Sequence, residues 1–246
     1  MAKKGELRVG TSGWQYDDWM GVFYPEGLPK SRWFSYYAQH FDTVEVNNTF
    51  YNLPSKETFD AWRDQAPPGF RYALKFSRYG TQMKKLKDAG STIARFIERA
   101  ERLKWSLGPV LVQLPPHWKR NAERLDGFLR AAPSAVRWAL EFRDGSWLHE
   151  EVFSVLREHH AALVIHDLID NHPREVTADW VYLRFHGVDY SHDYSPQALA
   201  GVAGWARKLL QQGLDVYAYF NNDYRGYAVN NARDLRHYIL YGNDRF

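Results

Sequence analysis

The stretch VLVQLPPHWKRNAERLDGFLRAAPSAVRWALEF, residues 110–142, contains the unit from which the fold can be predicted. Val110–Leu114 is a short run of β-favouring residues, and Arg137–Phe142 is a second one. Between them, Ala122–Ala131 has apolar residues at helical spacing. A strand, a helix and a second strand in this order predict a βαβ unit, in which the two strands are parallel.

The same alternation runs along the whole chain. Strands are predicted at Leu7–Thr11, Thr43–Asn47, Arg71–Phe76, Val110–Leu114, Arg137–Phe142, Ala162–His166, Val181–His186 and Asp215–Phe220. Helices are predicted between them at Ser31–His40, Lys56–Gln65, Ser91–Lys104, Ala122–Ala131, His149–His159, Pro196–Gln212 and Tyr227–Tyr241. Ser31, Ser55 and Ser195 stand where an N-cap is expected, and Gly213 follows a helix as a C-cap glycine does.

Eight such units in 246 residues have the size of one closed barrel. We therefore expect an α/β chain that forms a single (β/α)8 TIM-type barrel domain over residues 1–246. The connection Asp167–Asp179 holds Pro173, so the helix between strands six and seven should be short or missing. Gly10-Thr-Ser-Gly13 is not a GxGxxG turn and no GxxxxGK[ST] motif occurs, which argues against a doubly wound nucleotide-binding sheet.

Composition and charge exclude several classes of protein. The absence of cysteine excludes disulfides, thiolate nucleophiles and Cys-ligated metals. A formal net charge of +3 permits a polyanionic partner but does not indicate one. The basic N-terminal start has no apolar segment after it, and no run of 18 apolar residues occurs, so we expect a cytoplasmic protein without a signal peptide or a membrane span.

Alternation along the predicted strands separates apolar from polar side chains. Val44 and Val46, for example, should face the helices, which turns Glu45 toward the barrel axis. The side chains predicted to face inward near the C-terminal strand ends are Glu45, Asn47, Lys75, Gln113, Glu141, Arg143, Arg184 and His186. Burying unpaired charge costs several kcal/mol, and active sites of TIM barrels lie at this end. The alternative is an internally paired ion network, such as Glu141 with Arg184, which would not explain why the charges gather at strand ends.

Seven motifs at these positions resemble one known family. They are Gly10-Thr-Ser-Gly-Trp14, Glu45-Val-Asn-Asn-Thr-Phe-Tyr51, Gln113-Leu-Pro-Pro116, Glu141-Phe-Arg143, Arg184-Phe-His-Gly187, Tyr219-Phe-Asn-Asn222 and Asn230-Asn-Ala232. In this order they are similar to the YecE-like family, a bacterial and archaeal family of unknown function. The resemblance covers nearly the whole chain and implies a TIM-type barrel, but it implies no settled activity. Asn230-Asn231 could bond back to the Asn221-Asn222 turn or cap the last helix.

The residue types at the predicted mouth favour an anionic ligand. Lys75, Arg143 and Arg184 are candidates for gripping a phosphate or carboxylate. Glu45 and Glu141 are candidates for acid–base work and His186 is the candidate proton carrier. The remaining ligand-binding candidates are Asn47, Gln113, Asn221, Asn222, Trp14 and Tyr51. We expect an enzyme, of the hydrolase or isomerase type, that acts on a phosphorylated or nucleotide- or sugar-like molecule.

Other chemistries stay open. Glu45, Glu141, Asp167 and His186 could bind a divalent metal, although no HxH or HExxH spacing occurs and nearby cations would compete. His166 alone is better explained as a hydrogen-bonded histidine of the core or rim. Two carboxylates also allow glycoside hydrolysis, whereas no GxSxG elbow supports a serine triad.

The chief alternative is a barrel that binds nucleic acid, either without catalysis or as a phosphodiester-processing enzyme. The stretch Lys75–Lys87 combines basic side chains with an aromatic one, as single-strand binders do. Its members that support this reading are Arg78, Tyr79, Lys84, Lys85 and Lys87. The competing interpretation is an ordinary solvated surface.

Aromatic residues are abundant, with 10 Trp, 16 Tyr and 14 Phe. Fourteen of them lie in connections that follow the predicted strand ends. We expect these to form an aromatic-rich cleft suited to a ring-bearing ligand. They are Trp14, Tyr16, Trp19, Phe23, Tyr24, Phe50, Tyr51, Tyr79, Trp118, Trp147, Tyr190, Tyr194, Tyr224 and Tyr227.

Overall fold

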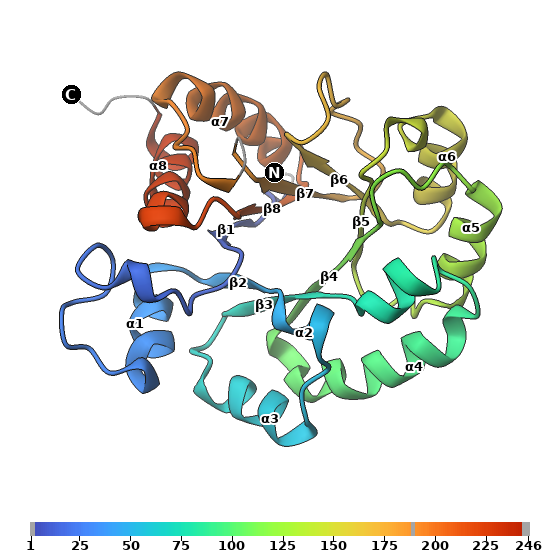
Figure 1. Ribbon diagram of the computed structural model, residues 1–246. Coiled ribbons are helices and arrows are strands. Elements are labelled where there is room, and N and C mark those ends of the chain that lie inside the picture. The colour runs from blue at the N-terminus through green and yellow to red at the C-terminus, as the bar shows by residue number, and fades with distance from the viewer. Residues whose placement is uncertain (1–2, 188–189, 243–246) are drawn as a thin grey trace. The chain divides into compact units, whose positions relative to one another are not determined.

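A computed structural model describes residues 3–187 and 190–242 of the chain. Eight strands alternate with helices (Figure 1), and the strand order in the sheet is β1-β8-β7-β6-β5-β4-β3-β2. The described pairings are parallel. The chain is therefore an α/β protein with the (β/α)8 fold of a TIM-type barrel, as the alternation predicts.

The chain divides by its internal contacts into two compact units. The first consists of Met1–Val44 and Asp179–Phe246, and the second consists of Glu45–Ala178. The expectation of one domain over residues 1–246 stays a prediction, and each unit is described by itself below. Within residues 3–187 and 190–242, no helix has both the length and the apolar composition needed to cross a bilayer.

The first unit is built around the last two strands. Its elements are β1 (Leu7–Thr11), α1 (Trp33–His40), β7 (Trp180–Phe185), α7 (Pro196–Gln211), β8 (Asp215–Phe220) and α8 (Tyr227–Tyr241), with 3-10 turns at Asp17–Trp19, Lys30–Arg32 and Tyr224–Gly226. Strand β8 pairs in parallel with β1 and with β7. Helices α7 and α8 pack on each other, and α8 covers β1 and β8 (Figure 1).

Gly10 of β1 marks a close approach of two backbones. A Cβ atom at this position would lie 2.3 Å from the carbonyl oxygen of Thr43 and 3.1 Å from the Tyr37 hydroxyl. The Tyr37 hydroxyl itself donates to the Thr43 carbonyl at 3.0 Å and accepts from the backbone N–H of Thr11 at 3.0 Å. Only glycine leaves room for this junction.

The second unit continues the alternation. Its elements are α2 (Asn48–Tyr51), α3 (Lys56–Gln65), β3 (Arg71–Lys75), α4 (Ala89–Ala100), β4 (Leu107–Gln113), α5 (Ala122–Ala131), β5 (Trp138–Glu141), α6 (Glu150–Glu158) and β6 (Ala162–His166). A π-helix, η3 (Tyr79–Met83), precedes α4, and two 3-10 turns follow at Glu101–Ser106 and Gly145–Trp147. Strand β2 (Thr43–Val46) crosses the boundary between the units.

Apolar side chains of this unit face the helices as the alternation predicts. The Phe76 ring lies 5.0 Å from that of Phe96 in α4, 5.6 Å from that of Phe128 in α5 and 6.0 Å from that of Trp138 in β5. Because side chains alternate along a strand, this packing turns Lys75 and Glu141 to the opposite face.

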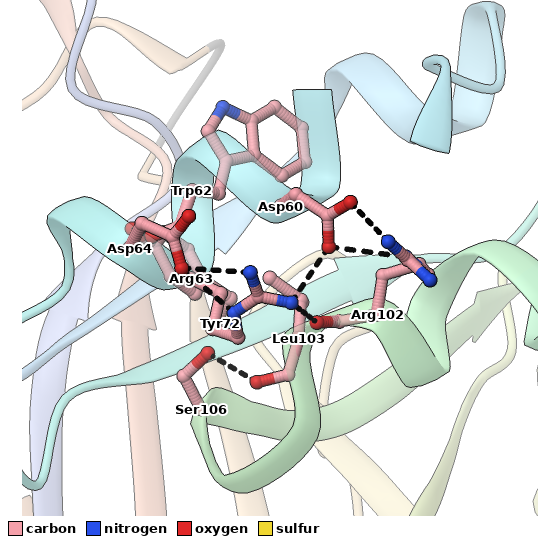
Figure 2. Close-up of polar contacts among 8 residues, drawn as sticks. All are labelled: Asp60, Trp62, Arg63, Asp64, Tyr72, Arg102, Leu103 and Ser106. Atoms are coloured by element: carbon pink, nitrogen blue, oxygen red, sulfur yellow. Dashed lines mark hydrogen bonds and ion pairs between the residues drawn. The ribbon is translucent and has the colours of Figure 1, made fainter. Parts of the chain in front are cut away.

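A polar network joins α3 to the 3-10 turn that precedes β4 (Figure 2). Arg63 Nη1 lies 2.6 Å from Asp60 Oδ1, and Arg102 Nε donates to the same oxygen at 3.0 Å. Arg63 also donates to the Arg102 carbonyl at 3.1 Å, and the Tyr72 hydroxyl donates to the Trp62 carbonyl at 2.8 Å. These contacts lie where β3 and β4 begin, so they stabilise the fold away from the strand ends that carry the candidate site.

Several element boundaries differ from the prediction by a few residues. Strand β4 starts at Leu107, β7 starts at Trp180, and His186 lies just after β7. The prediction that Ser31 caps α1 is wrong, because Ser31 lies in a 3-10 turn and the N-cap is Arg32. The other two predicted N-caps, Ser55 and Ser195, are confirmed. The stretch 167–179, which is described throughout, contains no helix, as its proline predicts.

Candidate functional site

Glu141 is the central charged residue at the strand ends of the second unit. Its side chain is 0% exposed. The β4–β5 register places Gln113 opposite Glu141, and Gln113 Nε2 donates to Glu141 Oε1 at 2.7 Å. Arg143 Nη1 lies 3.7 Å from the same oxygen, and its side chain is 22% exposed. The buried carboxylate thus orients a guanidinium that solvent can still reach.

Lys75 lies at the end of β3 and is almost fully buried. Its side-chain nitrogen lies 4.5 Å from the centre of the Phe50 ring, within range of a cation–π interaction. The Thr49 hydroxyl donates to the Lys75 carbonyl at 2.7 Å, which ties α2 to β3. Glu45, on β2, is fully buried, and Asn47 is the N-cap residue of α2 without a side-chain capping bond.

Two histidines lie near the end of β6. His166 is buried, and its Nε2 donates to the Phe142 carbonyl at 2.8 Å while its Nδ1 accepts from the Leu168 N–H. His166 is therefore a hydrogen-bonded core histidine, as expected. The His172 ring lies 4.6 Å from it, and burial, aided by His166, lowers the pKa of His172 to about 4. Sequence reasoning missed His172 because it lies in an irregular connection without periodicity.

In the first unit, Arg184 and His186 follow one another on the same face at the end of β7. They are 1% and 0% exposed. Arg184 Nη1 lies 3.4 Å from His186 Nε2, and the side-chain amide of Asn221 lies 3.2 Å from His186 Nδ1. Since a guanidinium can only donate, Nε2 of His186 is the acceptor in its contact with Arg184.

Asn222 takes part in a buried chain of amides. Its Nδ2 donates to the His192 carbonyl at 2.8 Å and to Asn231 Oδ1 at 2.9 Å, and Asn231 donates to Asp193 at 2.6 Å. One of the two interpretations of the Asn230-Asn231 pair is thereby confirmed for Asn231, which bonds back to the turn after β8. The N-cap of α8 is Gly226, so the capping interpretation is wrong.

The loop aromatics divide into buried and exposed groups. Trp19, Phe23 and Tyr24 are buried in a cluster with aromatic rings of α1. The ring of Tyr24 stacks on that of Trp33, with 4.7 Å between the ring centres. Trp147 is buried and stacks on Phe142 at 4.9 Å. The expectation that all fourteen line a cleft is wrong for these four residues, because the long connections after the strands require apolar cores of their own.

The two aromatics in the predicted ligand-binding set differ in exposure. Trp14 is 7% exposed and meets Phe34 edge to face at 5.5 Å, whereas Tyr51 is 65% exposed. Tyr79, Tyr190 and Tyr224 are also exposed. These four rings are the exposed members of the predicted aromatic cleft in the described chain, whereas Tyr16, Trp118, Tyr194 and Tyr227 are half-buried.

The predicted metal-ligating residues give no complete ligand set. In the part of the chain that the structure describes, no group of three or more His, Asp or Glu side chains is placed to hold a metal ion. Asp167 is exposed, unlike Glu45, Glu141 and His186. Within each unit, the described residues therefore give no arrangement that favours a metal.

Comparison with known proteins extends the resemblance seen in the motifs. The family model "Protein of unknown function DUF72" matches residues 8–243. The UPF0759 protein YecE of Escherichia coli K12 is 27% identical over 170 residues, which are 68% of this chain and 60% of YecE, less than two thirds of its length. The UPF0759 protein YunF of Bacillus subtilis 168 is 24% identical, and the match covers 93% of both chains.

Solved structures give the same assignment. A DUF72 family protein of Thermotoga maritima is 30% identical, with a TM-score of 0.85, and the match covers 94% of this chain and 98% of that one. A DUF72 family protein of Enterococcus faecalis V583 is 22% identical, with a TM-score of 0.80 and 95% of both chains covered, and it supports the fold alone. The predicted resemblance is confirmed: the chain belongs to the DUF72 family of proteins of unknown function.

Proposed function

We propose that this protein is an enzyme that binds a phosphate-bearing or other anionic, ring-containing small molecule at the C-terminal ends of its barrel strands. The observation that carries the proposal is the burial of charged side chains at strand ends within each unit. Lys75 is 8% exposed, Glu141 is 0% exposed and Arg184 is 1% exposed. Burying such groups costs several kcal/mol each, and fold stability alone is served better by apolar residues.

Arg143 is the side chain best placed to receive the anion in the second unit. Its guanidinium is held beside Glu141 yet remains 22% exposed. Glu141 is in turn held by Gln113. An anion-binding group whose partner is itself fixed loses little conformational freedom on binding, which favours a bidentate grip on phosphate or carboxylate.

The remaining roles follow from hydrogen-bonding capacity. In this proposal Glu45 and Glu141 are the acid–base carboxylates and His186 is the proton carrier, with the Asn221 side-chain amide beside its Nδ1. Asn47, Gln113, Asn221 and Asn222 orient the ligand. The reaction class is hydrolysis or isomerisation of a phosphorylated, nucleotide-like or sugar-like molecule.

Binding calorimetry on an Arg143→Gln variant tests the proposal. The probes are inorganic phosphate, AMP and glucose 6-phosphate. We expect at least one phosphorylated probe to bind the unaltered protein and to bind Arg143→Gln about 10- to 100-fold more weakly, because a charge-assisted hydrogen bond is worth about 1.5–3 kcal/mol.

Arg130→Gln is the matched control. Arg130 lies on α5 with its side chain 70% exposed and pairs with Asp126 at 2.7 Å, so this change removes a guanidinium away from the strand ends. Its affinity for the probes should equal that of the unaltered protein. The proposal would be overturned if Arg143→Gln bound the probes with the same affinity as the unaltered protein. It would also be overturned if no phosphorylated probe bound the unaltered protein.

Nucleic-acid binding is a second candidate function, supported by one surface feature. Tyr79 is 49% exposed, and Lys84 Nζ lies 5.8 Å from the centre of its ring. Arg78, Lys85 and Lys87 beside them are exposed. The test is a titration with single-stranded DNA at several salt concentrations. If this candidate is right, affinity should fall steeply as the salt concentration rises. Weak binding, or an affinity that does not change with salt, would refute it.

A further inference from the structure

A pocket of about 450 Å³ lies in the second unit, and none of the charged side chains at the strand ends lines it. The pocket is bordered by the end of α2, the turn after β3 and the first turns of α4. Its volume is within the range of small-molecule sites, about 300–1,000 Å³. The lining residues are Tyr51, Asn52, Leu53, Ser77, Tyr79, Ser91, Thr92, Arg95 and Phe96.

Two exposed aromatic rings are the largest side chains of the lining. Tyr51 is 65% exposed and Tyr79 is 49% exposed. Tyr51 is held by an edge-to-face contact with Phe50 at 5.1 Å, and the buried Phe96 adds an apolar surface. Tyrosine offers a flat apolar face with a polar tip, so these rings suit a planar ring that stays partly solvated.

Arg95 is the single charged residue of the lining. Within residues 3–187 and 190–242 its guanidinium has no ion pair, unlike Arg63 and Arg102 of the same unit. Ser77, Ser91 and Thr92 contribute hydroxyl groups, and no carboxylate lines the pocket. One cation with several hydroxyl donors favours an anion over a cation or a neutral ligand.

The backbone that carries this lining is unusual. Tyr79 starts the π-helix η3, and Lys85, Leu86 and Asp88 have left-handed φ values of 48°, 64° and 48°. Such residues cost on the order of 1 kcal/mol each and, like π-helices, concentrate at functional sites.

Gly80 lets the π-helix pack closely against its neighbours. A Cβ atom there would lie 2.7 Å from the Phe76 ring and 3.0 Å from Thr92. This connection therefore holds Tyr79 and the start of α4 in fixed positions around the pocket, at a cost that a plain solvent loop would avoid.

We infer that this pocket binds a small aromatic anion, a molecule in which a planar ring carries a phosphate, phosphonate or carboxylate group. The ring lies against Tyr51 and Tyr79, and the anionic group is bound by Arg95 and the neighbouring hydroxyls. The inference does not depend on the proposed function, because it uses none of the residues to which that function assigns charge or proton transfer.

Phenylphosphonate is the probe for the test, and it is compared with benzyl alcohol, a neutral molecule with the same ring, and with inorganic phosphate, an anion without a ring. In calorimetric titrations we expect phenylphosphonate to bind about tenfold or more tightly than either comparison compound. Arg95→Gln should weaken it by about tenfold, the loss of one charge-assisted hydrogen bond, and Tyr79→Ala should weaken it similarly. Both side chains are exposed, and unchanged thermal melting of each variant would confirm that the fold persists.

Arg130→Gln is the control for this pocket. It should bind phenylphosphonate as the unaltered protein does, because Arg130 lines neither the pocket nor the strand ends. Failure of the probe to bind, or equal binding by Arg95→Gln and Tyr79→Ala, would overturn the inference. Loss of binding in Arg143→Gln alone would place the probe at the strand ends, which would refute this pocket as its site while supporting the proposed function.

Discussion

Replacing His172 by phenylalanine should remove part of the acid sensitivity of this protein. The ring of His172 lies 4.6 Å from that of His166 and donates to the Pro173 carbonyl at 2.9 Å. Burial lowers its pKa from 6.5 to about 4. Between these two values the unfolded chain binds a proton that the folded chain does not, so the stabilisation is complete above about pH 6.5 and is lost as the pH falls toward about 4.

The size of the effect follows from the two pKa values of His172. At ~1.4 kcal/mol for each pH unit, the full difference is worth ~3 kcal/mol, of which ~2 kcal/mol would be lost between about pH 7.5 and about pH 5. The ring is only partly buried, and solvent screening reduces the expected loss to about 1–2 kcal/mol.

Urea unfolding at these two pH values measures the effect. On acidification the unaltered protein should lose about 1–2 kcal/mol more free energy of unfolding than His172→Phe does. His117→Phe, which replaces an exposed imidazole, is the control and should follow the unaltered protein. Parallel pH dependence of the unaltered protein and His172→Phe would refute the reasoning.

Three further substitutions test the packing and the polar network. Gly10→Ala should destabilise by about 1–3 kcal/mol in urea unfolding, because its Cβ would lie 2.3 Å from the Thr43 carbonyl oxygen. Gly127→Ala should instead stabilise the protein by up to about 1 kcal/mol, because Gly127 lies in α5 and no atom lies within 4 Å of the new Cβ. A lower free energy of unfolding in this variant would contradict the packing described. Asp60→Asn should lower the melting temperature at neutral pH but not at strongly acidic pH. Hydrogen bonds from Arg102 lower the pKa of the Asp60 carboxyl in the folded protein. The stability that Asp60 contributes is therefore present above its pKa in the unfolded chain and is lost as the pH falls through its pKa in the folded protein. An equal change in melting temperature at both pH values would refute this explanation.

The strands were predictable because they are buried on both faces. Runs such as Val110–Val112 and Ala162–Ile165 are continuously apolar, as parallel strands covered by helices are. Strand alternation also predicted that Gln113 and Glu141 share a face, and the β4–β5 register brings the two side chains together. Periodicity was therefore sufficient to predict that these two side chains share a face, whereas their contact depends on the strand register, which the sequence did not predict.

The connections were predicted less well because periodicity does not apply to them. His172 lies in an irregular segment, and its approach to His166 depends on tertiary packing. Trp19 is in a connection after β1, where its sequence position suggests exposure, yet its indole donates to the Asp223 carbonyl and is buried. A single sequence does not distinguish an aromatic residue that faces a ligand from one that forms a small local core.

A crystal structure of the protein soaked in phosphate tests the central claim most directly. The account predicts tetrahedral anion density within hydrogen-bonding distance of the Arg143 guanidinium, beside the Glu141–Gln113 pair that orients it. Phosphate at saturating concentration that leaves Arg143, Lys75 and Arg184 all without anion density would contradict it.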